Sequence, residues 1–199
     1  MTKFPMHTID ETDDPVIRGL LGSMKQKYGG MEPNLFGIMA NSPTILKSYI
    51  GQSLIFDKSG LSKSEQQLVL LTASVKNQCT YCVPSHSNMA FIRGLNGKFI
   101  EAVRAGQEIE DEKMQALRLF TEQVMEASGN VSQDKVSAFL EAGFTKEHVL
   151  DVVAGLALVT MANYTNLIAD VPLDDPYEMN KWSPDDQYGL PFTQLHSFQ

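Results

Sequence analysis

Apolar residues along this chain recur every three or four positions, the spacing that places them on one face of an α-helix. Residues 14–28 show the pattern clearly, and Gly29-Gly30 then interrupts it. Later segments repeat this spacing between Gly, Pro, Asn and Ser residues, which commonly begin or end helices. The pattern predicts helices over residues 14–28, 33–41, 42–56, 62–76, 79–94, 97–104, 110–128, 132–142 and 145–170.

Strands are not indicated, because no run of β-branched residues alternates between apolar and polar at period two. A chain of 199 residues is long enough to bury one sizeable core. We therefore expect an all-α fold of about eight to nine helices in a single domain over residues 1–199. Residues 30–105 hold the candidate chemistry. Residues 172–199 contain three prolines after Pro172 and little periodicity, which predicts an irregular tail lying on the body or on a neighbouring subunit.

Two local signals place helix starts near the candidate chemistry. Ser62-Lys63-Ser64-Glu65 is a capping box, in which the side chains of Ser62 and Glu65 each satisfy the backbone N–H of the other. Pro84 has no amide proton, so it fits best in the first turn of a helix, where that proton would have no partner. A helix should therefore begin at or just after Cys79.

Composition narrows the classes of partner. The formal net charge is −8, and an acidic surface repels phosphate backbones, which argues against nucleic acid. The first residues lack a basic stretch followed by an apolar one, so no secretory signal is expected.

The longest apolar stretch, 149–162, is interrupted by Asp151 and is too short to span a bilayer. We expect a cytoplasmic protein with no membrane partner, in which any disulfide is transient and catalytic.

The candidate chemistry lies in the segment Cys79-Thr-Tyr-Cys82-Val-Pro-Ser-His86. Cys79 and Cys82 are the only cysteines of the chain, and their spacing allows a reversible disulfide. On a helix, residues three or four positions apart share one face, so Cys79, Cys82 and His86 would lie together. His86 is then placed to take the proton of Cys82, and the thiolate is the form that attacks. This arrangement suits attack on a peroxide or a disulfide, followed by closure of the Cys79–Cys82 bond.

The role of each residue follows from this geometry. Cys82, next to His86, is the predicted attacking thiol, and Cys79 is its resolving partner. The reverse assignment stays open, because a Cys79 at a helix N-terminus would have a lowered thiol pKa. Tyr81 has two interpretations: it donates a hydrogen bond to an oxygen leaving group, or it only packs.

Two other functions use the same residues. A non-enzymatic redox sensor would use the dithiol to control assembly of an oligomer, without turnover. A metal-binding module would need a third and a fourth ligand beside the cysteines, and the remaining histidines, His7, His148 and His196, have no paired ligand spacing. The dithiol interpretation therefore ranks first, and it implies no metal, flavin or haem.

With these motifs the chain resembles the carboxymuconolactone decarboxylase-like superfamily, in its alkylhydroperoxidase D-like branch. The matching segments are residues 33–36, 61–75, 77–86, 94–95 and 142–145, the final helix and residues 170–174. The resemblance implies an all-helical fold, a trimer or hexamer, and peroxiredoxin-type reduction of small hydroperoxides with an external lipoyl-type or thioredoxin-like dithiol. The decarboxylases that give the superfamily its name lack the C-x-x-C pair, so lactone decarboxylation is disfavoured.

One position departs from the family pattern. In the family a glutamate twelve residues before the first cysteine completes a proton relay to the histidine, and here that position is Gln67. Glu65 lies roughly 200° around a helix from Gln67 and is accounted for by the capping box. His86 would then act as base alone, with an imidazole pKa starting from its ordinary value of about 6.5. The resemblance therefore implies a thiol peroxidase with an incomplete relay and weak activity.

Self-association is also predicted from the apolar residues alone. Residues 35–39, 45–56 and 149–161 carry more apolar side chains than the inward positions of one monomer would hide. A large exposed apolar patch usually marks an interface, and symmetric homo-oligomers are the commonest way of covering one.

Overall fold

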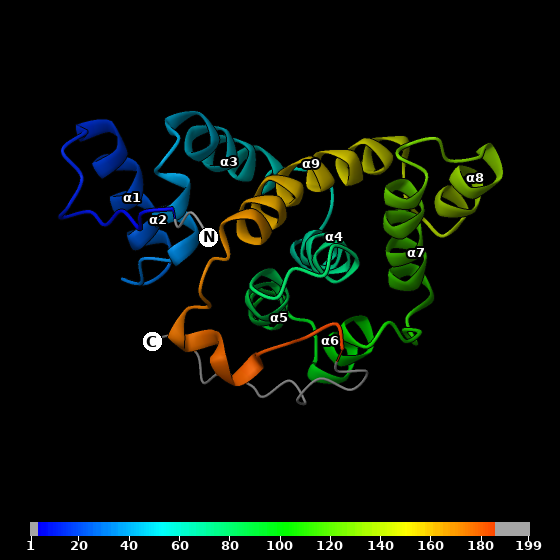
Figure 1. Cartoon of the computed structure of the whole chain (residues 1–199). Coiled ribbons are helices and arrows are strands. Elements are labelled where there is room, and N and C mark those ends of the chain that lie inside the picture. The colour runs from blue at the N-terminus through cyan, green and yellow to red at the C-terminus, as the bar shows by residue number, and fades with distance from the viewer. Residues whose placement is uncertain (1–3, 186–199) are drawn as a thin grey trace.

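The computed structural model describes residues 4–185, and over this range the chain forms nine α-helices, one short 3-10 helix and no strand (Figure 1). The elements are α1 (Pro15–Lys27), α2 (Asn34–Met39), α3 (Pro43–Phe56), α4 (Lys63–Lys76), α5 (Cys82–Ile92), α6 (Gly97–Arg104), α7 (Glu112–Glu126), α8 (Gln133–Glu141), α9 (Lys146–Ala169) and η1 (Asp175–Asn180). The predicted all-α, single-domain fold is confirmed, with helix boundaries within a few residues of those expected.

The predicted capping box at the start of α4 is present. The Ser62 hydroxyl accepts a hydrogen bond from the Glu65 N–H, and Glu65 Oε2 accepts one from the Ser62 N–H at 2.7 Å. Glu65 Oε1 also accepts from Lys113 Nζ of α7 at 2.8 Å. This carboxylate is therefore fully engaged at the helix start.

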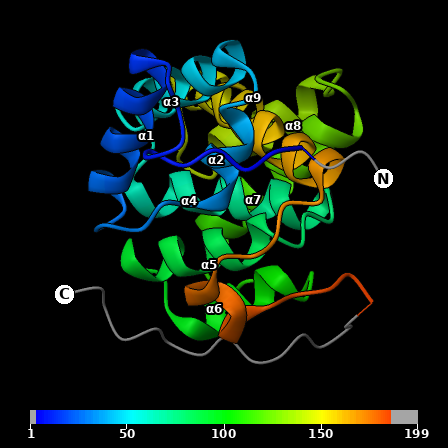
Figure 2. The same cartoon turned by 60° about the vertical axis from the view of Figure 1, so that its left-hand side comes forward.

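α4 lies at the centre of the fold and packs against α5, α6, α7 and α9 (Figures 1 and 2). Consecutive residues 68–74 are all buried, as in a helix surrounded by protein on every side. α9 crosses beside α3 and α4. At Gly155 of α9 an added Cβ would lie 2.8 Å from the Phe56 ring, so glycine is what allows this close approach.

α9 has 24 residues and is long and apolar enough to cross a membrane by length and composition. Core helices of soluble proteins meet the same criterion. Here α9 packs against α2, α3, α4, α5 and α7, and its Asn163 and Asn166 hydrogen-bond to Ser74 of α4 and Cys82 of α5. These contacts are typical of a core helix.

Of the apolar segments that we expected to be partly exposed, one is buried in the structure and two keep exposed apolar side chains. Residues 35–39 of α2 are buried, which corrects the prediction for this segment. They are covered because the N-terminal segment lies on α2, where the His7 N–H donates to the Gly37 carbonyl at 3.2 Å. Exposed apolar side chains remain on α3 and α9: Leu54, Ile55, Leu150, Val153, Tyr164, Leu167 and Ile168.

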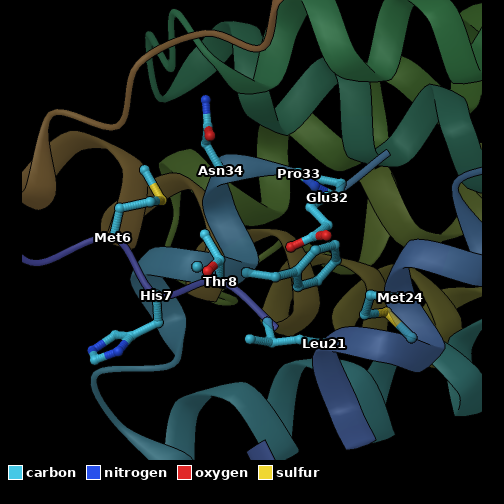
Figure 3. Close-up of a pocket in the computed structure, with 10 residues that line it drawn as sticks. Met6, His7, Thr8, Leu21, Met24, Glu32, Pro33 and Asn34 are labelled. Atoms are coloured by element: carbon cyan, nitrogen blue, oxygen red, sulfur yellow. The ribbon is translucent and has the colours of Figure 1, made fainter. Parts of the chain in front are cut away.

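A small cavity lies between the N-terminal segment, α1 and α2 (Figure 3). It is lined by Met6, His7 and Thr8 on one side and by Leu21 and Met24 of α1 on another. Its volume is about 50 Å³, well below the roughly 300–1,000 Å³ of small-molecule sites. None of the predicted site residues lines it.

The segment predicted to be an irregular tail contains η1 and packs on the body as far as the structure describes it. η1 contacts α5. Arg104 of α6 donates to the carbonyls of Asn180 and Lys181 at 3.1 and 3.2 Å, and the Trp182 indole N–H donates to the Arg104 carbonyl at 3.3 Å. Residues 186–199 lie outside the described range.

Candidate active site

The C-x-x-C pair lies in the turn between α4 and α5. Gln78 has a φ of 54°, and the Cys79 N–H bonds back to the Ser74 carbonyl at 3.0 Å. Cys79 therefore belongs to the closing turn of α4, because its N–H still bonds to that helix. α5 begins at Cys82. The helix was predicted to begin at or just after Cys79, and it begins three residues later, at Cys82, with Pro84 in its first turn as predicted.

Cys79 and Cys82 are joined by a disulfide, with Cα atoms 5.2 Å apart. The Cys82 N–H also donates to Cys79 Sγ at 3.2 Å. Cys79 is fully buried, while Cys82, 2% exposed, lines a cavity of about 450 Å³, much larger than the one beside α1 and called the main cavity below. Of the two sulfurs, Cys82 is thus the one that a molecule in the cavity would meet.

His86 lies one helical turn after Cys82 and lines the same cavity. Its Nδ1 is 3.2 Å from Oε1 of Gln67 on α4. An amide oxygen only accepts hydrogen bonds, so Nδ1 carries the proton and Nε2 is the basic nitrogen. The structure therefore brings together the two residues that the family resemblance paired.

Burial lowers the pKa of the His86 imidazole from 6.5 to about 4, because desolvation disfavours the imidazolium. The ordinary value used as the starting point from the sequence is therefore too high. At neutral pH His86 is uncharged and able to accept a proton, but it is a weak base. A neutral partner at position 67 does nothing to restore its basicity.

Tyr81 is held in place by its own hydroxyl. The hydroxyl donates to Asp174 Oδ2 at 2.5 Å and accepts from the Leu35 N–H at 3.4 Å. Asp174 Oδ1 in turn accepts from the Asn34 N–H at 2.9 Å. Burial raises the pKa of Asp174, and the Tyr81 bond opposes that rise. This geometry favours positioning of the C-x-x-C turn over proton donation by Tyr81.

Sequence reasoning missed Asn166 of α9. Its side-chain N–H₂ donates to Cys82 Sγ at 3.2 Å and to the Ala162 carbonyl at 2.9 Å. The Ala162 bond fixes the amide orientation, because an oxygen there would face another acceptor. Asn166 is 4% exposed, and its Oδ1 has no hydrogen-bond partner among the described residues. The available signal was a pair of amides, Asn163 and Asn166, within the mostly apolar second half of α9.

Replacing Asn166 with leucine should raise the pKa of the reduced Cys82 thiol by about one unit. A hydrogen bond to a charged group contributes about 1.5–3 kcal/mol, and one pKa unit corresponds to about 1.4 kcal/mol. Thiolate absorbance measured against pH tests this. Asn163→Leu, on the same helix and directed to Ser74, is the control, and an equal rise in that variant would contradict a specific role for Asn166.

The main cavity has a volume of about 450 Å³, within the range of small-molecule sites. Cys82, His86, Gln67 and Asn166 line it together. Within residues 4–185 no group of three or more His, Cys, Asp or Glu side chains is placed to hold a metal ion. Near the disulfide the cavity therefore presents a sulfur, an imidazole and two amides, together with the hydroxyl-bearing side chains of Tyr81 and Ser85.

Residues 48–122 match the sequence profile of the Carboxymuconolactone decarboxylase family. This range includes all of α4, α5 and α6, and thus both cysteines and His86. Over these residues the chain is similar to that family. Among curated proteins, none matches it.

Several solved structures share the fold of this chain. An uncharacterized peroxidase-related protein from Ralstonia eutropha, an alkylhydroperoxidase AhpD core, has a TM-score of 0.79 and 24% identity over 88% of this chain and 93% of its own. A second peroxidase-related protein, from a Silicibacter species, has a TM-score of 0.74 and 17% identity over 88% and 95%.

A third similar structure is a variant of the debrominase Bmp8 in complex with 2,3,4-tribromopyrrole. It has a TM-score of 0.72 and 16% identity, covering 88% of this chain and 92% of that one. At these identities the likeness establishes the shared fold. The debrominase shows that this fold occurs in at least one enzyme.

Proposed function

We propose that this protein is a dithiol-dependent peroxidase that reduces hydroperoxides through a reversible Cys79–Cys82 disulfide. The observation that carries the proposal is the position of Cys82, which is half of the disulfide and faces a ligand-sized cavity beside His86. A purely structural disulfide would have no need of such a cavity. The similar fold of peroxidase-related proteins supports the same reaction class.

In the first step His86 accepts the proton of Cys82, and the thiolate attacks one peroxide oxygen. An S–O bond forms and the O–O bond breaks, leaving a Cys82 sulfenic acid and an alkoxide that takes the proton back from His86 to become an alcohol. Asn166 stabilises the thiolate, and its unpaired Oδ1 is available to accept from the hydroperoxide O–H.

In the second step the Cys79 thiol attacks the Cys82 sulfenic acid. The S–S bond forms, the S–O bond breaks, and water leaves. An external dithiol of the lipoyl or thioredoxin-like class then restores both thiols by disulfide exchange, giving up two electrons and two protons. We place this cycle in the cytoplasm, where thiols are normally kept reduced.

Mild peroxide should remove two free thiols per chain without cross-linking subunits, because Cys79 and Cys82 are already within bonding distance. Thiol titration and non-reducing electrophoresis measure both quantities. Steady-state peroxide consumption with lipoyl and thioredoxin-like donors then tests turnover. Disulfide formation without turnover by any donor would favour the redox-sensor alternative, and an intermolecular disulfide as main product would contradict the proposal.

We also propose that the chain forms a homo-oligomer, a trimer or hexamer as the resemblance implies. The exposed apolar side chains of α9 support this, since Leu150, Val153, Tyr164 and Ile168 are each about half exposed or more. Light scattering at micromolar concentration should give a mass above that of one subunit. Tyr164→Lys with Ile168→Lys should shift the mass toward the monomer, and a monomeric parent protein would overturn the proposal.

A further inference from the structure

The main cavity follows α5 from its first residue to its end. Cys82, His86, Met89, Ile92 and Arg93 all line it, at the spacing of one helix face. At about 1.5 Å rise per residue, Cys82 and Arg93 are roughly 16 Å apart along the helix axis. A molecule that occupied the whole cavity would therefore be long, with one end at the reactive sulfur and the other near Arg93.

The walls between these two ends are largely apolar and aromatic. The side chains come from α1 to α5 and from α9: Tyr28, Phe36, Tyr49, Phe56, Leu70, Met89 and Leu158. Such a lining favours a hydrocarbon or aromatic body, which gains free energy in proportion to the apolar area it buries. Hydrogen peroxide would use almost none of this surface.

The far end of the cavity carries two basic side chains, Lys27 and Arg93. The carboxylate of Asp57 also lines the cavity. It is paired with Lys63 at 2.7 Å and feels the charges of Arg93 and Lys27, so this end holds two cations against one anion that is already paired. Lys27 Nζ is 3.3 Å from the neutral hydroxyl of Ser53. Among the described residues, neither Lys27 nor Arg93 forms an ion pair with a carboxylate.

The electrostatic setting of Lys27 favours binding of an anion. Burial lowers the pKa of its ammonium; Asp57 partly opposes this, and the charges of Arg93 and Lys63 add to it. A bound anion would offset both the burial and the repulsion. The chain as a whole has a net charge of −8. The positive charge at this end of the cavity therefore differs in sign from the charge of the whole chain.

Resting on the proposed peroxidase function, we propose that the substrate is an amphipathic hydroperoxide that carries a carboxylate at the end remote from the peroxide. Its apolar body fills the aromatic section, its peroxide group reaches Cys82, and its carboxylate is held by Lys27 and Arg93. The chemistry at sulfur is that already written, and the carboxylate is unchanged by it. The two cations are thus specificity residues, apart from the reacting atoms.

Binding to the disulfide form tests the inference without any turnover. Calorimetry with decanoate and with decanol should show about five- to tenfold tighter binding of the carboxylate, since the two cations, although exposed, attract it together at one end of the cavity. Lys27→Met with Arg93→Met should abolish this preference and leave decanol affinity unchanged. Lys47→Met with Lys98→Met removes the same charge from exposed positions outside the cavity and should change neither affinity. Equal affinity of the parent protein for both ligands would overturn the proposal.

A kinetic comparison separates this inference from the proposed function. The parent protein should show a KM for 12-hydroperoxydodecanoate about five- to tenfold below that for its methyl ester, with similar kcat. The Lys27→Met, Arg93→Met variant should lose this difference through KM alone. Turnover of both substrates with equal KM would refute the carboxylate site and keep the peroxidase. Absence of turnover, with decanoate preferred in calorimetry, would refute the peroxidase and keep the carboxylate site.

Discussion

Replacing Cys82 with serine is expected to abolish peroxide turnover, lowering the rate roughly a thousandfold or more, because a serine hydroxyl cannot supply the nucleophile or form the disulfide. Cys79→Ser should also stop turnover but should still reduce one equivalent of hydroperoxide per chain. The difference arises because Cys82 lines the cavity, whereas Cys79 is fully buried and does not. Single-turnover peroxide consumption and a sulfenic-acid probe measure it.

The paired variants control for each other, since each removes one sulfur from the same turn. Circular dichroism of both reduced proteins verifies that the fold survives the loss. Single-turnover activity in Cys82→Ser, together with none in Cys79→Ser, would reverse the two roles. That outcome would require a route to Cys79 that the disulfide form of the protein does not offer.

Gln67→Glu should increase the rate of disulfide formation at neutral pH by about tenfold, which is below the 10²–10⁴-fold typical of a complete acid–base catalyst. A carboxylate 3.2 Å from Nδ1 would stabilise the imidazolium that forms when Cys82 gives up its proton. The pKa of His86, about 4 in the parent protein, would rise, because an opposite charge favours the protonated form. His86 would then be a stronger base in the transition state.

The pH profiles of the two proteins should differ in shape. In the parent protein His86 is already neutral above about pH 5, so the rate should rise with pH through titration of the Cys82 thiol. In Gln67→Glu the plot of rate against pH should show a second inflection, below that of the Cys82 thiol. It would lie at the raised pKa of His86. Gln67→Met, which removes the hydrogen bond without adding charge, is the control. An unchanged rate in Gln67→Glu, with the fold intact, would mean that position 67 takes no part in proton transfer.

Much of the fold could be predicted from sequence because helix formation here depends on neighbours three and four positions apart. The capping box at Ser62 and the Pro84 signal are local in the same sense, and both hold in the structure. α5 begins three residues after Cys79, because the left-handed Gln78 keeps the Cys79 N–H bonded to α4. No local pattern distinguishes that turn from a helix start.

The candidate site was predictable only where its residues are close in sequence or match a family motif. Cys79, Cys82 and His86 share one segment, and Gln67 was found through the family resemblance. Asn166 was missed because it reaches Cys82 across 84 positions, through the packing of α9 on α5. Lys27 and Arg93 lie at the ends of two different helices. They line the same cavity only because of the way these helices pack, which no local sequence pattern predicts.

The Tyr81–Asp174 hydrogen bond joins residues 93 positions apart, and this has a consequence for biosynthesis. At roughly 5–20 residues per second, Asp174 leaves the ribosome on the order of 5–20 s after Tyr81. Throughout that interval the growing chain carries both thiols, yet it lacks the aspartate that anchors their turn and the asparagine of α9 that contacts Cys82. During this interval we expect small thiols in the surroundings to set the redox state of the dithiol. The contacts from Asp174 and Asn166 can influence that state only after α9 and η1 have been made.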